Sequence, residues 1–179
     1  KGIETLTWQQ FMGKYLMKGK FVISVAGTHG KTTTTAMIAK ILEDAGLDPT
    51  VALGAIVPWW GTNYRVGKSK YFIVEADEYN DNFLAFNPDI SVVTNIEMDH
   101  PESFKDFKAY QSSFKKFLKQ AKKVINKTKP TDFSLKIPGK FNKENASLAY
   151  QVGLLLNINP EVIKKSLQNY TGVSRRFEY

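Results

Sequence analysis

Hydrophobic and polar residues follow one another in two patterns along this chain. Short apolar runs rich in β-branched residues are typical of buried strands, and longer stretches with apolar residues every three or four positions are typical of helices. These patterns predict strands at residues 21–26, 51–57, 71–76 and 90–95. They predict helices at residues 32–45, 103–123, 142–156 and 160–169. Gly46 is expected to cap the end of the first helix, and Asn159 and Pro160 are expected to begin the last.

The predicted strands and helices alternate, which is the arrangement of an α/β protein. The expected fold is a doubly wound, mostly parallel sheet with a phosphate-binding loop and with helices on both faces. Ligands of such sheets bind at the carboxyl ends of the strands. The residues that follow each predicted strand are therefore the first candidates for a functional site.

Composition narrows the class of protein. The chain has 179 residues, of which 42% are hydrophobic, enough for one sizeable core and too few for two ordinary domains. The absence of cysteine excludes disulfides and thiolate metal sites and favours a cytoplasmic location. No apolar run approaches the roughly 20 residues of a membrane-spanning helix. We therefore expect a cytoplasmic protein without a membrane partner.

The chain is basic, with a formal net charge of +8, and many lysines lie between Lys105 and Lys143. Apolar residues recur at spacings of three and four in the predicted helix 103–123, so they are expected to face a core and the lysines to face water. These apolar residues are Phe107, Tyr110, Phe114, Phe117 and Leu118. A solvated basic face that attracts anionic substrates is thus favoured over nucleic-acid binding.

A glycine-containing loop joins the first predicted strand to the first predicted helix. It reads Gly27-Thr28-His29-Gly30-Lys31-Thr32-Thr33, a shortened GxxGKT form of the phosphate-binding loop. Backbone N–H groups of such a loop converge on phosphate, and the helix N-terminus adds a positive dipole. A plain surface turn is the alternative, but the flanking strand and helix favour nucleotide binding. We predict that Lys31 contacts the β- and γ-phosphates of ATP and that Thr32 ligates Mg²⁺.

Acidic residues follow two further strands. Glu75-Ala76-Asp77-Glu78 ends the strand at 71–76, and Thr94-Asn95-Ile96-Glu97-Met98-Asp99-His100 ends the strand at 90–95. Taken singly, the first could be a charged turn and His100 a turn histidine. Because both segments are expected at the same edge of the sheet as Lys31, we predict that they hold the metal that bridges ATP to an acceptor.

Five segments occur in the order seen in the Mur ligases. They are residues 26–34 (AGTHGKTTT), 75–78 (EADE), 94–100 (TNIEMDH), 138–142 (PGKFN) and 175–178 (RRFE). The chain therefore resembles the central ATPase domain of this family, and in particular of its alanine-adding members. The resemblance implies peptidoglycan precursor synthesis, in which ATP converts the carboxylate of UDP-N-acetylmuramate to an acyl phosphate that the amino group of L-alanine attacks.

The resemblance also implies a role for each matching residue. Lys31 and His100 would be catalytic, Thr32 and Glu75 would hold one Mg²⁺, and His100 would ligate a second. The ATP-binding residues would be Gly27, Thr28, His29, Gly30, Lys31, Thr32, Thr33, Asn142 near the adenine, and Arg176, which closes over the nucleotide. A helix N-cap and a surface arginine are the alternative interpretations of Asn142 and Arg176. Lys31 is expected to neutralise charge and to have no part in the core.

The chain departs from the family pattern at several places. Phe141 stands where a histidine is usual, Asn80 stands where an aspartate is frequent, and the stretch 124–138 is short. The expected organisation is a lead-in segment at 1–20, a P-loop ATPase central domain at 21–171, and at 172–179 the start of a linker to a C-terminal domain that the chain lacks. Flanking domains would bind the UDP sugar and the amino acid, so this chain alone is not expected to ligate.

Three other functions remain open from the sequence. A ligase that recycles murein tripeptide has the same sequence motif as residues Glu75–Tyr79 of this chain. A small P-loop kinase would leave the turn at 95–100 unexplained. A nucleotide-binding module without turnover would need the same phosphate loop.

Overall fold

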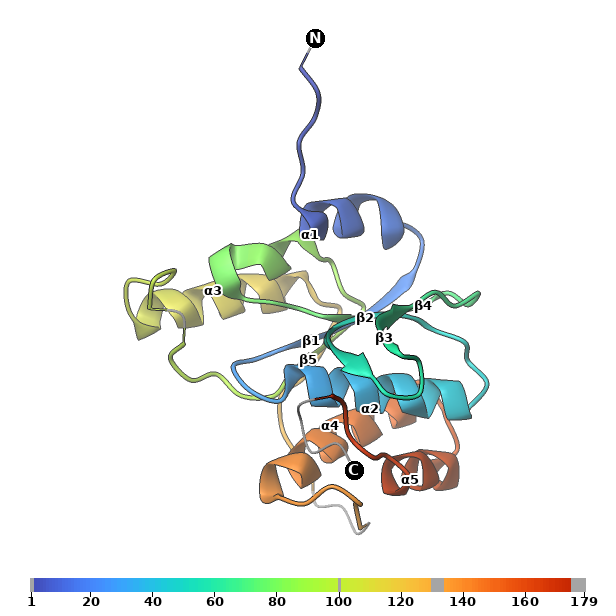
Figure 1. The fold of residues 1–179 in the computed structure, drawn as a ribbon. Helices are drawn as coiled ribbons and strands as arrows, with labels where there is room; N and C mark the ends of the chain where they lie inside the picture. The colour runs from blue at the N-terminus through green and yellow to red at the C-terminus, as the bar shows by residue number, and fades with distance from the viewer. Residues whose placement is uncertain (1, 100, 130–133, 175–179) are drawn as a thin grey trace.

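The computed structural model describes residues 2–99, 101–129 and 134–174, and these form one six-stranded sheet between two layers of helices (Figure 1). The strands are β1 (Phe21–Ala26), β2 (Thr50–Val57), β3 (Thr62–Arg65), β4 (Tyr71–Glu75), β5 (Ile90–Val93) and β6 (Lys123–Ile125). Their order is β3-β2-β4-β1-β5-β6, and only the β2–β3 pair is antiparallel. The predicted doubly wound, mostly parallel α/β fold is confirmed.

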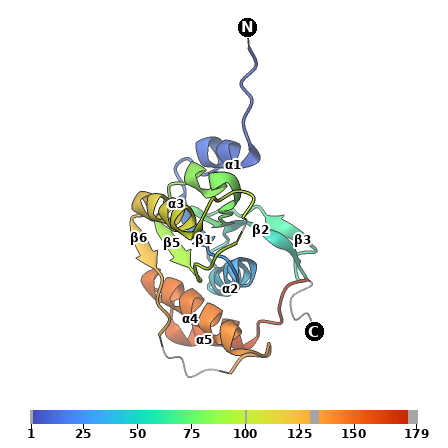
Figure 2. The ribbon, with the colours of Figure 1, turned by 90° about the vertical axis from the view of Figure 1, so that its left-hand side faces the viewer.

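Helices cover both faces of the sheet (Figure 2). On one face lie α2 (Lys31–Asp44), α4 (Lys140–Leu155) and α5 (Pro160–Gln168), and on the other lie α1 (Trp8–Phe11), the helical turns η1 (Met12–Leu16) and η2 (Tyr79–Ala85), and α3 (Phe107–Gln120). Successive residues of a strand point to opposite faces. Accordingly Ile23 and Val25 belong to the core under α2, and Val22 belongs to the core under α3.

The strand order places the phosphate loop at the centre of the sheet. β1 lies between β4 and β5, and the chain crosses from one side of β1 to the other when it passes from β4 to β5. The carboxyl ends of these three neighbouring strands therefore meet at one crevice, which is where open α/β sheets bind ligands.

The element predictions were correct at β1 and nearly so at α2, and the helix expected over 103–123 is present as α3 but is shorter at both ends. α3 begins at Phe107, because the Asp106 side chain accepts a hydrogen bond from Ala109 N at 2.8 Å and caps it. It ends at Gln120, and Lys123–Ile125 form the edge strand β6 instead. Phe107, expected in the core, is 41% exposed.

The beginning of α5 is as predicted, while the end of α2 differs from the expectation. The Asn159 side chain accepts a hydrogen bond from Glu161 N at 2.9 Å, and Pro160 is the first helical residue. The cap residue of α2 is Ala45, and Gly46 follows it with φ +73°.

The predicted lead-in segment is partly helical. Thr7 and Gln10 form a capping box that begins α1, and Met12 and Met17 are buried against the core under α3. The boundaries predicted at 21–171 and 172–179 stay a prediction. Within the described part of the chain no helix is both long and apolar enough to cross a membrane.

Candidate functional site

The phosphate loop turns sharply between β1 and α2 at two glycines with positive φ. Gly27 has φ +133° and Gly30 has φ +82°, conformations that side chains disfavour. A Cβ at Gly27 would lie 2.1 Å from Thr94 Oγ1, and a Cβ at Gly30 would lie 2.5 Å from Asn145 Oδ1. The loop is therefore packed too closely for side chains at these positions, and α2 begins directly after Gly30.

Residues at the end of β5 hold this loop in place. Thr28 N donates to Asn95 O at 3.1 Å, and His29 N donates to the side-chain oxygen of Asn95 at 2.8 Å. The Thr94 hydroxyl donates to His29 O at 2.5 Å. The turn at 94–99 thus supports the phosphate loop, a role that the sequence did not assign to Thr94 or Asn95.

Thr32 and Glu75 lie together, as predicted for a metal site. The Thr32 hydroxyl donates to Glu75 Oε1 at 2.9 Å, and Gly54 N donates to Glu75 Oε2 at 2.7 Å. A hydroxyl and a carboxylate are hard oxygen ligands of the kind that Mg²⁺ prefers. The described residues contain no cluster of three or more His, Cys, Asp or Glu that could enclose a metal. This donor set fits Mg²⁺, which is usually bound by one or two carboxylates together with phosphates and waters.

Lys31 is held by the loop and by Glu78. Its Nζ donates to Gly27 O at 2.6 Å and lies 2.9 Å from Glu78 Oε2, and the Glu78 side chain is fully buried. Glu78 belongs to the acidic segment seen in the sequence, but its pairing with Lys31 was not predicted. Lys31 is therefore also a member of a largely buried ion pair, which was not expected of a residue predicted to serve charge neutralisation alone.

Tyr110 of α3 completes this arrangement. Its hydroxyl donates to Glu78 Oε1 at 3.1 Å and lies 3.0 Å from Thr28 Oγ1. Burial raises the pKa of the Tyr110 phenol above its ordinary value of 10.0, and the charges of Glu78 and Asp99 raise it further, while the Thr28 hydrogen bond lowers it. The phenol therefore stays protonated at neutral pH.

Asn145, in the second turn of α4, lies against Gly30 of the loop. Asn142 is buried and donates from Nδ2 to Pro138 O at 2.6 Å, and Gly139 is the N-cap residue, so the N-cap interpretation of Asn142 is wrong. A pocket of about 300 Å³ is lined by both the loop and α4. Its lining comprises His29, Gly30, Thr94, Asn95, Phe141, Glu144, Asn145 and Leu148. The assignment of Asn142 to the adenine stays a prediction.

A second pocket, of about 510 Å³, is lined by Lys31 and Glu75. Its other lining residues are Trp8, Met12, Ala52, Leu53, Gly54, Asn63, Tyr64 and Asp77. It combines aromatic side chains with the predicted phosphate and metal ligands. Trp8 and Tyr64 come from the helix and the strand that the sequence did not predict.

Two of the predicted site residues, His100 and Arg176, lie outside the described residues. The structure brings together Lys31, Thr32 and Glu75, with Thr28, His29 and Thr33 on the same loop and helix start. Glu78, Tyr110, Asn95 and Asn145 join them. The sequence placed Glu78 and Asn95 in the two predicted metal-binding segments and Tyr110 in an apolar stripe, but it did not predict the contacts that they make here, because each contact joins residues far apart in the chain.

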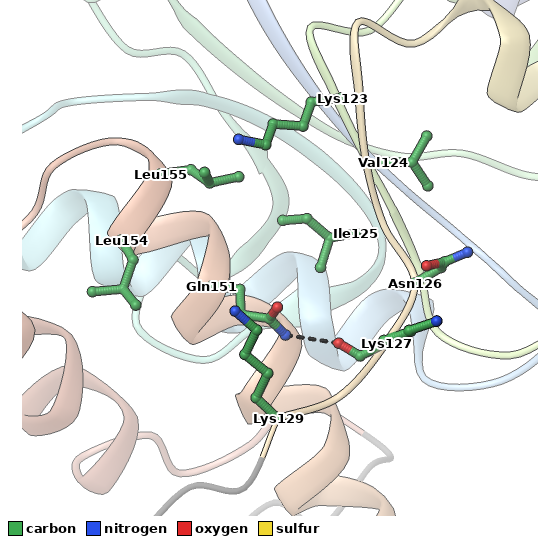
Figure 3. A pocket seen from close by; sticks show the side chains of 9 residues that line it. All are labelled: Lys123, Val124, Ile125, Asn126, Lys127, Lys129, Gln151, Leu154 and Leu155. Atoms are coloured by element: carbon green, nitrogen blue, oxygen red, sulfur yellow. Dashed lines mark hydrogen bonds between the residues drawn. The ribbon is translucent and has the colours of Figure 1, made fainter.

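A further pocket, of about 380 Å³, lies at the β6 edge of the sheet (Figure 3). Gln151 of α4 donates there to the main-chain oxygen of Lys127 at 2.9 Å, beside Leu154 and Leu155. Lys123 and Lys129 also line it. None of the predicted ATP or metal ligands lines this pocket.

Several known proteins that are similar to this chain are ligases with the same name. The UDP-N-acetylmuramate--L-alanine ligase of Caldicellulosiruptor saccharolyticus is 34% identical over 229 aligned positions, which cover 99% of this chain and 50% of that protein. The same enzyme of Acetivibrio thermocellus is 33% identical over 99% of this chain and 49% of that protein. The chain thus spans about half the length of the curated relatives it matches. The aligned span exceeds 179 residues, so these relatives carry additional segments within it.

Solved structures show the same fold. The UDP-N-acetylmuramate-alanine ligase MurC of Thermotoga maritima superposes with a TM-score of 0.85 at 25% identity and covers 94% of this chain and 49% of that one. The UDP-N-acetylmuramate:L-alanyl-gamma-D-glutamyl-meso-diaminopimelate ligase of Neisseria meningitides has a TM-score of 0.84 at 22% identity, covering 93% and 71%. Residues 25–132 match the Mur ligase middle domain, and the chain belongs to the Mur ligase family.

Proposed function

We propose that this chain is the ATP-binding middle part of a ligase that joins L-alanine to UDP-N-acetylmuramate in peptidoglycan precursor synthesis. The observation that carries the proposal is the contact between Thr32 and Glu75 at 2.9 Å, where the helix after the phosphate loop meets the end of β4. The names of the relatives at 32–35% identity support the choice of substrates. The proposed location is the cytoplasm, in keeping with the absence of cysteine.

The proposed reaction has two steps. First, an oxygen of the muramyl carboxylate bonds to the γ-phosphorus of ATP, and ADP leaves with the electron pair of the broken P–O bond. Second, the amino nitrogen of L-alanine bonds to the acyl carbon, phosphate leaves with the C–O electron pair, and the nitrogen loses a proton. Phosphoryl transfer between anions depends chiefly on positioning and charge neutralisation.

The residues of this chain would supply both the positioning and the charge neutralisation. Backbone N–H groups of residues 27–33 would bind the phosphates, and Lys31 would neutralise charge on the transferred group. Thr32 and Glu75 would hold Mg²⁺, which when bound supplies positive charge next to the phosphate oxygens. His100 as ligand of a second Mg²⁺, and Asn142 and Arg176 as nucleotide contacts, are part of the proposal through the family resemblance.

The acceptor is proposed to enter through the pocket that Trp8, Tyr64 and Glu75 line. This pocket reaches both Lys31 and the proposed metal ligand Glu75, so a carboxylate within it would lie next to the transferred phosphate. Flanking domains are proposed to bind the UDP sugar and L-alanine, since the relatives are about twice as long as the region matched here. No nucleic-acid or membrane partner is proposed.

The alternatives have less support. A tripeptide-recycling ligase rests on a likeness at 22% identity, which concerns the fold alone. A P-loop kinase or a nucleotide-binding module without turnover would need the phosphate loop, but neither accounts for the relatives at 34% identity.

Two threonines of α2 offer a matched test. Thr32→Val removes the proposed Mg²⁺ ligand, whereas Thr34→Val removes a buried hydroxyl that has no hydrogen-bond partner in the described structure. Calorimetry with Mg-ATP should give clearly weaker binding for Thr32→Val and unchanged binding for Thr34→Val. Equal affinities for all three proteins, or no binding by the wild type, would contradict the proposal.

A further inference from the structure

Glu78 is a buried acidic residue, and its carboxylate requires hydrogen-bond donors. Its side chain has no exposed surface, yet it carries a carboxylate, three residues after the end of β4. Burying a carboxylate is costly unless it is paired and hydrogen-bonded. The Lys31 ammonium lies 3.0 Å from Oε1 and 2.9 Å from Oε2, and the Tyr110 hydroxyl donates to Oε1 at 3.1 Å. Lys31 of α2 and Tyr110 of α3 therefore both donate hydrogen bonds that stabilise this carboxylate.

Glu78 also determines where the Lys31 ammonium lies. An ammonium has three protons to donate. Apart from Glu78, the partners of Lys31 Nζ are Gly27 O at 2.6 Å and Thr28 O at 3.4 Å, which belong to the phosphate loop itself. Glu78 is thus the partner of Lys31 that lies outside the phosphate loop, in the segment between β4 and η2. The longer contact to Thr28 O is the one that a phosphate oxygen would replace most easily.

The packing around Tyr110 fixes the position of its hydroxyl beside Glu78. Its ring is fully buried and packs edge-on against Phe104, with centroids 5.0 Å apart, and also contacts Phe114. The hydroxyl lies 3.0 Å from Thr28 Oγ1, which in turn accepts from Glu97 N at 2.9 Å. Because burial raises the pKa of the phenol, the hydroxyl keeps the proton that it donates to Glu78.

We propose that Tyr110 is a positioning residue for Lys31 and acts through Glu78. The inference rests on the proposed nucleotide binding. The tyrosine hydroxyl fixes one carboxylate oxygen, so that the carboxylate holds the Lys31 ammonium at the phosphate end of the loop before ATP arrives. When Lys31 turns toward a phosphate, the same hydroxyl keeps the buried carboxylate hydrogen-bonded.

The competing explanation is that the Tyr110 hydroxyl only holds α3 against the rest of the protein. The same helix offers a control for this explanation. Ser113, three residues after Tyr110 on the same helix, hydrogen-bonds the Asp81 carboxylate. Asp81 belongs to the segment that follows Glu78 and has φ +58°. Ser113→Ala therefore removes a bond from the same helix to the same segment without touching a partner of Lys31. Tyr110→Phe keeps the ring and removes only the hydroxyl.

The first test needs no nucleotide. The ¹⁵N signal of the Lys31 ammonium is recorded by NMR in the wild-type chain, Tyr110→Phe and Ser113→Ala, with Lys31→Arg for assignment. We expect Tyr110→Phe to shift this signal and to speed its proton exchange about fivefold or more, the effect of losing a hydrogen bond to a charged group. Ser113→Ala should leave it unchanged. An unchanged signal in Tyr110→Phe, or equal changes in both variants, would overturn the inference.

The second test measures Mg-ATP affinity. Tyr110→Phe should weaken binding about five- to tenfold, as expected for one hydrogen bond to a charged group. The same substitution in a Glu78→Gln background should have no further effect, because residues that act through one another are not additive. AMP, which lacks the β- and γ-phosphates, should bind both proteins equally. Additive losses, or an equal loss for AMP, would overturn the inference. Absence of wild-type Mg-ATP binding would count against the proposed function, and the NMR test would still decide the role of Tyr110.

Discussion

Lys31 and Glu78 form an ion pair at 2.9 Å in which the carboxylate is fully buried and the lysine side chain is only 14% exposed. The phosphate-loop lysine therefore has a structural partner as well as a proposed ligand. Removing one member of a buried pair leaves the other charged and unpaired, which is more costly than losing an exposed pair. Substitutions at Lys31 should consequently affect folding as well as nucleotide binding.

Lys31→Ala is expected to abolish Mg-ATP binding and to lower the free energy of unfolding by about 3–5 kcal/mol, because Glu78 stays buried without its cation. Urea unfolding followed by circular dichroism measures the second effect. Adding Glu78→Gln should restore much of the stability without restoring binding, since the buried group is then neutral.

Lys40 is a suitable control for that experiment. It lies on the same helix and pairs with the exposed Asp44 at 3.1 Å. Lys40→Ala should cost less than about 1 kcal/mol, the usual value of an exposed pair. Equal destabilisation by Lys31→Ala and Lys40→Ala would contradict a structural role for the Lys31–Glu78 pair.

Glu75→Gln is expected to raise the Mg²⁺ concentration needed for half-maximal ATP binding about tenfold, equivalent to about 1.4 kcal/mol. The amide keeps the size of the side chain and an acceptor for Gly54 N, but it loses the charge that attracts the metal. Titration of Mg²⁺ at fixed ATP measures the change, with Asp44→Asn as an exposed acidic control. An unaltered Mg²⁺ requirement in Glu75→Gln would argue against Glu75 as a ligand.

Local signals in the sequence predicted the centre of the fold and missed its edges. The β-branched run of β1 and the apolar face of α2 give strong patterns. β3 consists of Thr62–Arg65, with no buried residue, and β6 has three residues, of which only Ile125 is buried. Neither strand has an apolar alternation to detect, and each is formed by pairing with a neighbour already in the sheet.

The residues of the candidate site likewise divide into those that the sequence predicted and those that it did not. Gly27, Gly30, Lys31 and Thr32 could be predicted because the loop conformation is encoded by residues next to one another. Tyr110 could not, because its contact with Glu78 joins residues 32 positions apart. In the sequence Tyr110 is one member of an apolar stripe, and nothing there distinguishes its hydroxyl from the rings around it.

Tyr110 should make stability depend on alkaline pH. Its folded-state pKa lies above the ordinary value of 10.0, so above about pH 10 the unfolded chain releases a proton that the native chain retains. The unfolded state then binds fewer protons, and the free energy of unfolding falls as pH rises, by at most about 1.4 kcal/mol per pH unit for this group. The other tyrosines add their own contributions, so the quantity to measure is the difference between wild type and Tyr110→Phe. Denaturant unfolding from pH 9 to 11 should show this difference shrinking, and a constant difference would contradict the burial of the phenol proton.

The 179-residue chain is expected to bind Mg-ATP without joining L-alanine to UDP-N-acetylmuramate. Ligation requires the carboxylate, the γ-phosphate and the amine to be held in attack geometry, a contribution worth about 7–11 kcal/mol when complete. The described residues bring the proposed phosphate and metal ligands together. The relatives are about twice as long as the matched region, and flanking domains are proposed to hold the two other substrates. A phosphate-release assay and a product assay on the purified chain measure both activities, with the Thermotoga maritima enzyme as positive control. We expect little phosphate release and no UDP-N-acetylmuramoyl-L-alanine. Substrate-dependent ligation at a rate near that of the control would mean that the phosphate loop, the metal ligands and the pocket beside Trp8 and Tyr64 suffice for the whole reaction.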